Sequence, residues 1–315
     1  MTSFTSARKA AGPPRRRNRG RARSAPYLFV APFVALFLAF LVAPTLYAIV
    51  SSFFGMRRSG LGLDGEGPSL EFVGFDNFRA ALGDSEFLAG FGRVFLFGIV
   101  QVPVMLGLAL VFALLIDSAL VRFKKSVQLV IFLPYAIPGV VAALLWGFLY
   151  QPGVSPVVGF LESVGVQADF LAPGTVLWSI ANVTTWSYIG VNMVILFAAL
   201  QAIPTDVYEA ARLDGAGGLR IALGIKLPLI LPTLLLTCLM SIIGTLQLFN
   251  EPEVLRSLTS NVSSDFTPNM AILEVTTMGN NRNLGAAMAI VLAVVSLVLS
   301  LAVSRFDRSK ESPKR

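Results

Sequence analysis

Long apolar runs alternate with shorter polar segments along most of the chain. Six of these runs are long enough to cross the hydrocarbon core of a bilayer, which takes about 20 helical residues. We therefore predict an all-α membrane protein with six transmembrane helices. The predicted spans are residues 27–50, 92–116, 126–150, 174–200, 227–249 and 284–304.

The remaining residues divide the chain into three parts. Residues 1–25 are rich in Arg, Pro and Ser, a composition that predicts a disordered arm. Residues 26–305 form the predicted transmembrane domain, and residues 306–315 form a short tail. A cleaved signal peptide over residues 1–43 is an alternative interpretation, but the apolar run at 27–50 is much longer than the apolar region of a signal peptide.

The connection after the first predicted span, residues 51–91, is long and has two halves. Its first half is rich in glycine and is predicted to be flexible. In its second half, apolar residues recur at helical spacing, which predicts a short amphipathic helix at the membrane surface. These apolar residues are Phe72, Phe75, Phe78, Ala81 and Leu82.

Composition supports the membrane class and excludes several functions. The chain is 55% hydrophobic and 14% charged, whereas a soluble domain is about 25% charged. It has no histidine, so the commonest general base and metal ligand is missing. The single cysteine, Cys238, cannot form an internal disulfide. We find no paired carboxylates or activated serine, and we predict neither a catalytic residue nor a metal site.

The positive charges indicate the orientation of the chain. The net charge of +7 lies mostly in the two ends and in the second and fourth connections. Basic residues stay in the cytoplasm during membrane insertion, so both termini are predicted to be cytoplasmic. The basic arm is expected to anchor this topology and to attract anionic lipid headgroups, rather than to bind nucleic acid.

Acidic residues are missing from the interior of the four central spans. Asp117 and Glu251 lie only at span boundaries. A proton-coupled carrier usually needs ionisable groups within the bilayer, so a secondary carrier is the weaker alternative. The chain also has no G-x-x-x-x-G-K-[ST] phosphate-binding loop. If ATP drives transport, another chain must bind ATP and Mg²⁺.

The connection between the fourth and fifth spans, residues 201–226, has the features of a short helical hairpin. Pro204 suits the first position of a helix, where a missing N–H costs nothing. Asp206 and Glu209 favour the positive end of the helix dipole. Gly215 fits a left-handed residue that ends the helix. We predict a helix–turn–helix parallel to the membrane on its cytoplasmic face, a shape suited to meeting a partner.

This connection also carries a specific family resemblance. The stretch Glu209-Ala-Ala-Arg-Leu-Asp-Gly-Ala, followed by Pro228 and Pro232, resembles the EAA loop of permeases of ATP-binding-cassette (ABC) importers. The resemblance implies a coupling helix that sits in a groove of a separate ATPase. Leu219 and Ala222 depart from the family pattern, in which Trp and Phe are usual. The implied docking residues are Glu209, Ala210, Ala211, Asp214, Gly215 and Ala216.

Three further segments, beginning at Phe72, Phe132 and Gly244, resemble sugar permeases of the maltose type and favour the F subunit family. Together the similar segments cover most of residues 27–305. They imply a bacterial inner-membrane subunit that imports a di- or oligosaccharide by alternating access. The implied partners are a second permease subunit, a dimer of ATP-binding subunits, an extracytoplasmic solute-binding protein and membrane lipid. Glycerol phosphate or an amino acid remains an alternative substrate.

Polar residues on the fourth and fifth spans are candidates for the substrate pathway. Polar groups inside a membrane must face a partner or water, and uncharged donors beside aromatic rings suit a neutral sugar. Small hydroxyl residues at four-residue spacing also let membrane helices pack closely, so packing is the competing interpretation. The candidates are Thr184, Trp186, Tyr188, Asn192, Ser241, Thr245, Gln247 and Asn250.

Overall fold

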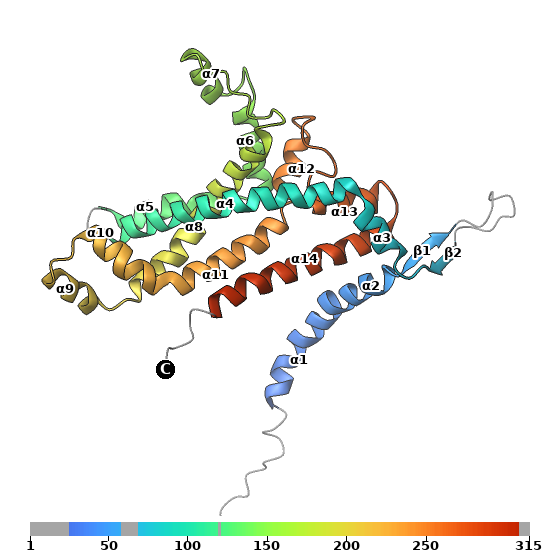
Figure 1. Ribbon diagram of the computed structural model, residues 1–315, viewed down its shortest axis with the longest axis horizontal. Coiled ribbons are helices and arrows are strands. Elements are labelled where there is room, and N and C mark those ends of the chain that lie inside the picture. Colours follow the sequence, from blue (N-terminus) through green and yellow to red (C-terminus); the bar gives the residue numbers. More distant parts are fainter. Residues whose placement is uncertain (1–24, 58–68, 119–120, 309–315) are drawn as a thin grey trace, which may run out of the picture. The chain divides into compact units, whose positions relative to one another are not determined.

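The computed structural model is predominantly helical, and its described residues form two compact units (Figure 1). The first unit is Met1–Ala48 and the second is Ile49–Arg315. The predicted arm up to residue 24 and most of the predicted C-terminal tail lie outside the described residues. The described ranges are 25–57, 69–118 and 121–308.

The described part of the first unit is one helical segment that is largely apolar. It contains α1 (Ala25–Phe37), the π-helical turn η1 (Leu38–Val42) and the beginning of α2 (Ala43–Ser51). The stretch Tyr27–Ser51 is long and apolar enough to cross a membrane, in agreement with the first predicted span. No residue of its most apolar window is buried, as expected for a helix whose surroundings are lipid or other helices.

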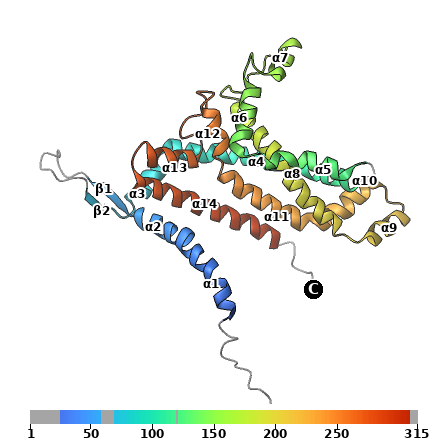
Figure 2. The ribbon, with the colours of Figure 1, turned by 180° about the vertical axis from the view of Figure 1, so that it is seen from behind.

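Four long helices form the bundle of the second unit, in which α4, α11 and α14 run side by side (Figures 1 and 2). Each helix lies in a stretch that is long and apolar enough to cross a membrane. One end of the bundle carries the α9 helix (Thr205–Leu213) and is called the α9 end below. The four helices are α4 (Ser85–Asp117), α8 (Val176–Gln201), α11 (Leu227–Leu246) and α14 (Arg282–Arg308).

Small residues let α4 and α8 pack closely. Ala109 and Ala113 of α4 are fully buried and belong to one apolar cluster with Met193 and Leu196 of α8. Small residues bring helix backbones together, and dispersion contacts then supply most of the attraction between helices in lipid. This packing places the C-terminal ends of α4 and α8 together at the α9 end, where Gln201 Nε2 donates a hydrogen bond to Asp117 Oδ1.

The third predicted span is not one straight helix. The segment 126–150 is broken into α5 (Lys124–Phe132), the 3₁₀ turn η2 (Leu133–Ala136) and α6 (Gly139–Tyr150), with a bend of 97°. Pro134 and Pro138 lack an N–H, and a proline disfavours helical geometry in the preceding residue. The described chain therefore contains five candidate spans, or six if this bent pair is one span.

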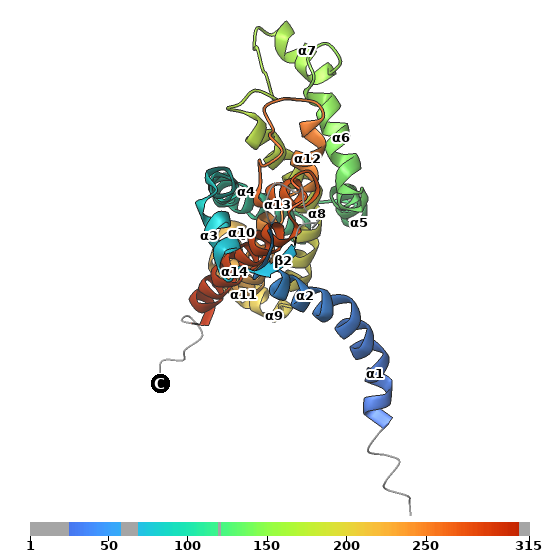
Figure 3. The same ribbon diagram turned by 90° about the vertical axis from the view of Figure 1, so that its right-hand side faces the viewer.

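Short elements gather around α6 on one side of the bundle (Figure 1). Figure 3 shows α6 leaving the bundle, with α7 (Pro156–Ser163) beyond it and α12 (Asn250–Arg256) beside it. The close packing of α6 on α12 uses Gly147, because an added Cβ there would lie 3.2 Å from Leu255 Cδ2. The α13 helix (Pro268–Thr277) precedes α14.

The connection after the first helical segment contains two short strands that the all-α prediction did not include. Strands β1 (Phe54–Arg57) and β2 (Ser69–Phe72) pair antiparallel, with Phe54 opposite Phe72. The α3 helix (Asp76–Gly83) follows, which confirms a short helix in this region, although Phe72 lies in β2. The glycine-rich part of this connection, at 58–68, is outside the described residues.

One glycine is required where α8 crosses α5. Gly190 of α8 is buried, and a Cβ added there would lie 2.7 Å from the Cα of Phe132 and would also collide with the carbonyl oxygen of Ile131. Both neighbours are backbone atoms, so rotation of a side chain cannot relieve the collision. Gly107 of α4 offers a contrast, because an added Cβ there meets nothing within 4 Å.

We predict that Gly190→Ala destabilises the protein by about 1–3 kcal/mol, the usual effect of overpacking a well-packed site. The matched variant Gly107→Ala should leave stability unchanged or raise it slightly, because alanine favours helix over glycine. Thermal unfolding of both variants in the same detergent measures the difference. Equal unfolding midpoints for the two variants would contradict the close α5–α8 approach.

Candidate functional site

The α9 helix is a short helix with well-defined ends. Pro204 is the N-cap of α9 rather than its first helical residue, so the helix begins one residue later than predicted. Asp206 lies in its first turn. At its other end, Gly215 N donates to Arg212 O at 3.0 Å and Ala216 N donates to Ala211 O at 2.9 Å. These two bonds form a Schellman motif, which requires a left-handed residue after the helix.

Gly215 supplies that left-handed residue, with φ of +78°. This confirms the prediction that Gly215 ends the helix. A side chain in this conformation costs about 1–2 kcal/mol, whereas glycine has no such penalty. The surroundings of Gly215 are open, since an added Cβ would meet nothing within 4 Å inside the chain. The backbone at Gly215 is thus accessible to another molecule.

The six predicted docking residues divide into an outer and an inner group. Glu209, Ala210, Asp214 and Gly215 are exposed, so their positions fit a surface for a partner. Ala211 is buried and accepts the hydrogen bond that closes the helix, and Ala216 is half-buried. These two alanines therefore shape the end of α9, while their part in docking stays a prediction.

Two leucines that the sequence analysis did not select are prominent on the same loop. Leu213 is 89% exposed and Leu219 is 74% exposed, although both are large and apolar. Leu213 is the last residue of α9, and Leu219 lies in the short helix α10 (Gly218–Ile221). Exposed apolar residues beside polar ones are typical of protein interaction surfaces. The sequence offered one signal for these two residues, which is that both lie in the connection between the fourth and fifth predicted spans.

The polar positions of α8 do not share one environment. Thr184 is 6% exposed and its hydroxyl donates to the carbonyl oxygen of Ala181 at 3.0 Å, while Asn192 is 7% exposed and its amide donates to the carbonyl oxygen of Tyr188 at 2.9 Å. Tyr188 is 45% exposed, and its ring centroid lies 6.0 Å from that of Tyr135. Trp186 is partly buried against an apolar cluster, and its ring centroid lies 5.8 Å from that of Trp146. Among these four positions, Tyr188 is the accessible one.

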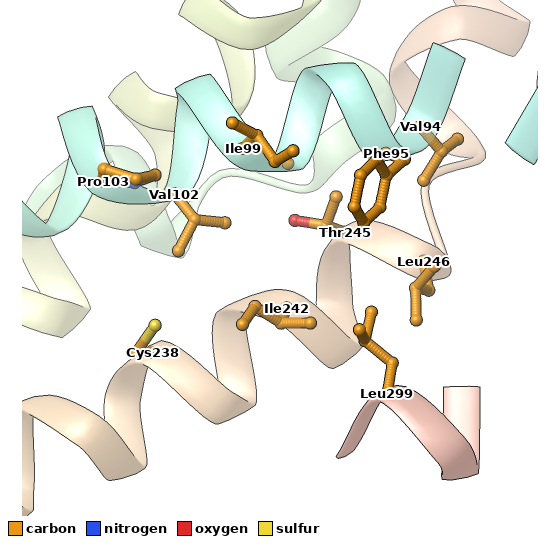
Figure 4. A pocket seen from close by; sticks show the side chains of 11 residues that line it. Val94, Phe95, Ile99, Val102, Pro103, Cys238, Ile242, Thr245, Leu246 and Leu299 are labelled. Carbon is orange, nitrogen blue, oxygen red and sulfur yellow. The ribbon is translucent and has the colours of Figure 1, made fainter. Parts of the chain in front are cut away.

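The hydroxyl residues of α11 bond mainly to their own helix. Ser241 donates to the carbonyl oxygen of Thr237 at 2.8 Å, and Thr245 donates to that of Ser241 at 2.9 Å. Thr245 also lines an apolar crevice of about 270 Å³ between α4, α11 and α14 (Figure 4). In Figure 4, Phe95 and Leu299 lie on the neighbouring helices. Thr245 therefore faces a largely apolar space in this structure.

Gln247 and Asn250, just after α11, are both exposed. Gln247 lines an open groove of about 820 Å³ together with Asn269 and Thr276 of α13 and Ser296 of α14. This groove mixes amide, hydroxyl and apolar surface, which suits a neutral polar ligand. Contact of any of the eight predicted pathway residues with substrate stays a prediction.

Glu251 is a charged residue beside these positions that the sequence analysis placed only at a span boundary. It is 6% exposed and lies in the first turn of α12. A Cβ added to Gly139, the first residue of α6, would lie 3.5 Å from Glu251 Oε1. A carboxylate is favoured near the first turn of a helix, where free N–H groups point outward. The break at Pro138 creates this helix start, which explains why sequence spacing alone did not place Glu251.

Two curated relatives match almost the whole chain. The osmoprotective compounds uptake permease protein GgtC of Synechocystis is 30% identical over 295 residues, which cover 91% of this chain and 99% of GgtC. The sn-glycerol-3-phosphate transport system permease protein UgpA of Agrobacterium fabrum is 31% identical over 285 residues, which cover 89% of this chain and 94% of UgpA.

Solved structures share the fold. A chain of a bacterial ABC transporter involved in the import of the acidic polysaccharide alginate matches with a TM-score of 0.80 and 21% identity. The match covers 93% of this chain and 98% of that chain. A second structure, the alginate ABC transporter in complex with an alginate pentasaccharide-bound periplasmic protein, matches with a TM-score of 0.78.

A match to a family model assigns the chain to a protein family, independently of these pairwise matches. The model described as "Binding-protein-dependent transport system inner membrane component" matches residues 105–312, which include the α9 helix and its Gly215 turn. The resemblance to ABC importer permeases is therefore confirmed, and the chain is a transport component rather than an enzyme. The chain belongs to the family of inner membrane components of binding-protein-dependent transport systems.

Proposed function

We propose that this permease forms half of the translocation pathway of a carbohydrate importer and docks on its ATPase through the loop 201–226. The observation that carries the proposal is the end of α9. There the Schellman motif holds Glu209, Ala210 and Gly215 at an exposed surface that has no covering element within the described chain. The exposed Leu213 adds apolar area to that surface.

The charge distribution supports a cytoplasmic position for the α9 end. Arg212 and Arg220 lie on the loop itself, and Lys124 and Lys125 begin α5 at the same end as Asp117. Acidic residues such as Glu86 lie at the other end of α4. Basic residues near span ends stay in the cytoplasm, so both termini are assigned to the cytoplasmic side.

The proposed mechanism is alternating access with three kinds of partner. A solute-binding protein delivers substrate on the outer side, and this chain pairs with a second permease subunit to enclose it. ATP–Mg binds to a dimer of separate ATPases, and their closure moves α9 and the spans that it connects. ATP hydrolysis then resets the spans. The chain itself contributes binding and motion, because it has no phosphate-binding loop of its own.

A di- or oligosaccharide is the favoured substrate class. The accessible candidates Tyr188, Gln247 and Asn250 are uncharged, and an aromatic face beside amides suits a polyhydroxyl ligand. The relatives named for glycerol phosphate transport support that substrate as the second candidate. A phosphate ligand is usually held by Arg or Lys. The charged residue beside these candidates is instead the acidic Glu251, which favours the sugar.

Gly215 gives a test of ATPase docking with a matched control. We predict that Gly215→Trp lowers copurification of the ATPase subunit about tenfold or more, because the new side chain projects from the docking surface. Gly153, which follows α6, has nearly the same backbone conformation, with φ of +77° and nothing within 4 Å of an added Cβ. Gly153→Trp carries the same backbone strain and should leave copurification unchanged.

Both variants should insert into the membrane at the level of the unmodified chain. Copurification and ATP-driven uptake are measured on complexes that contain the same amount of this chain. Full copurification and full transport by Gly215→Trp would count against docking through the loop 201–226.

Tyr188 gives a test of the substrate pathway. We predict that Tyr188→Ala lowers uptake of neutral sugar about tenfold, because an accessible aromatic face is lost. Thr237→Val should change uptake by less than about twofold, since the Thr237 hydroxyl is buried and already bonded to its own helix. Uptake into proteoliposomes is measured with labelled maltose, sucrose and glycerol 3-phosphate. Uptake of glycerol 3-phosphate alone would select the second candidate, and equal effects of the two variants would contradict the assignment of Tyr188.

A further inference from the structure

A polar cluster joins four helical segments at the α9 end of the bundle. Asp117 is the last residue of α4, and Gln201 is the last residue of α8. Lys226 ends the π-helical turn η3 (Ala222–Lys226), directly before α11, and Tyr208 lies in α9. These four residues are called the Asp117 junction below. Asp117 and Lys226 are 109 positions apart in the sequence, so only the fold brings them together.

Both oxygens of the Asp117 carboxylate are used. Lys226 Nζ donates to Oδ2, and Gln201 Nε2 donates to Oδ1 at 2.6 Å. Lys124 Nζ at the start of α5 donates to the backbone carbonyl oxygen of Asp117 at 3.2 Å. The side chains of Lys226 and Asp117 are only 14% and 8% exposed. A buried charge is tolerated only when it is paired and hydrogen-bonded, and this geometry meets both conditions.

The same cation contacts α9 through an aromatic ring. Lys226 Nζ lies 4.8 Å from the centroid of the Tyr208 ring, within the range of a cation–π interaction. The Tyr208 hydroxyl is buried and has no hydrogen-bond partner within the described part of the chain. Burial, together with the nearby charge of Asp117, raises the pKa of the Tyr208 phenol. Tyr208 is therefore held by its ring rather than by its hydroxyl.

We propose that the Asp117 junction transmits movement of α9 to α4, α8 and α11, with Tyr208 as the positioning residue that engages it. The inference rests on the proposed docking of α9 on an ATPase. Displacement of α9 alone would remove the aromatic face from Lys226. Displacement of Lys226 would leave the buried Asp117 carboxylate without this ion-pair partner. The junction thus favours movement of all four segments together.

The π-helical turn supports this role. A π turn contains one more residue per hydrogen-bonded ring than an α turn, so it shifts the direction of the side chains that follow it. Lys226 closes this turn and also caps α11. An ion pair that served only to hold the bundle together would join α4 to α11 without a contact to α9. The ring contact of Lys226 with Tyr208 is the feature that such a role leaves unexplained.

Tyr208 offers a matched pair of variants. Tyr208→Phe keeps the ring and removes the unpaired hydroxyl, whereas Tyr208→Leu keeps apolar bulk and removes the ring. Amide hydrogen exchange of residues 205–213 is measured first on the full chain in lipid nanodiscs without ATPase. Tyr208→Leu should raise this exchange about tenfold, the effect of losing a largely desolvated cation–π contact, while Tyr208→Phe should match the unmodified chain. Equal exchange in the two variants would overturn the proposal.

The second measurement uses the complete transporter with its ATPase subunits. Addition of ATP–Mg and vanadate should change exchange at the end of α4, residues 110–117, in the unmodified protein and in Tyr208→Phe. In Tyr208→Leu this response should be lost although the ATPase still copurifies. A response retained by Tyr208→Leu would show that movement reaches α4 by another route, and would overturn the proposal.

The charge pair is tested with variants that remove or keep one charge. Asp117→Asn should weaken the ATP-dependent response at residues 110–117, whereas Lys226→Arg keeps the positive charge and its contact with the Tyr208 ring and should retain the response. A full response in Asp117→Asn within an assembled complex would count against the ion pair as the link. Failure of docking through the loop 201–226 would be recognised separately, by a Gly215→Trp complex that keeps its ATPase. That result would not affect the hydrogen exchange of residues 205–213 measured on the chain without ATPase.

Discussion

Backbone hydrogen bonding is the constraint on which the rest of this structure depends. In lipid, N–H and C=O groups have no water to bind, so each span must satisfy them within its own helix. The long helices α4 and α8 follow this rule and pack through small residues such as Ala109 and Ala113. The break between α5 and α6 departs from it. Irregular backbone at membrane depth is tolerated only inside protein or beside water, so a break within the membrane would have to face the interior of a complex or a polar pathway.

The α9 loop follows from the same constraint. A short helix outside a bilayer can expose its ends and its apolar side chains, and α9 exposes Gly215 and Leu213. The Schellman motif fixes where the helix stops, and the Asp117 junction ties the helix to the bundle. A surface held in this way can meet a partner and also pass a displacement to the spans. The loop thus joins a local conformational requirement to the proposed transport function.

Local signals in the sequence predicted the parts of the structure that local chemistry determines. Hydropathy located the apolar spans, and Gly215 marked the end of α9 because few other residues adopt its backbone conformation. The rotation of each helix was not predictable, since it depends on packing; Thr184 and Asn192 therefore proved buried while Tyr188 is exposed. The pairing of Asp117 with Lys226 depends on contacts across 109 residues. The break within the predicted span 126–150 was missed, although Pro134 and Pro138 were the available signal for it.

The most direct test of the central claim is a cross-link from the α9 loop to the ATPase. In a Cys238→Ser background, Leu213→Cys places one thiol at an 89% exposed position of α9, and Leu82→Cys places one at a 55% exposed position of α3, near the other end of the bundle. A thiol-to-amine cross-linker is then applied to the assembled transporter. The account predicts a covalent adduct with the ATPase subunit from position 213 and none from position 82. An adduct from position 82, or none from position 213 in an assembled complex, would contradict it.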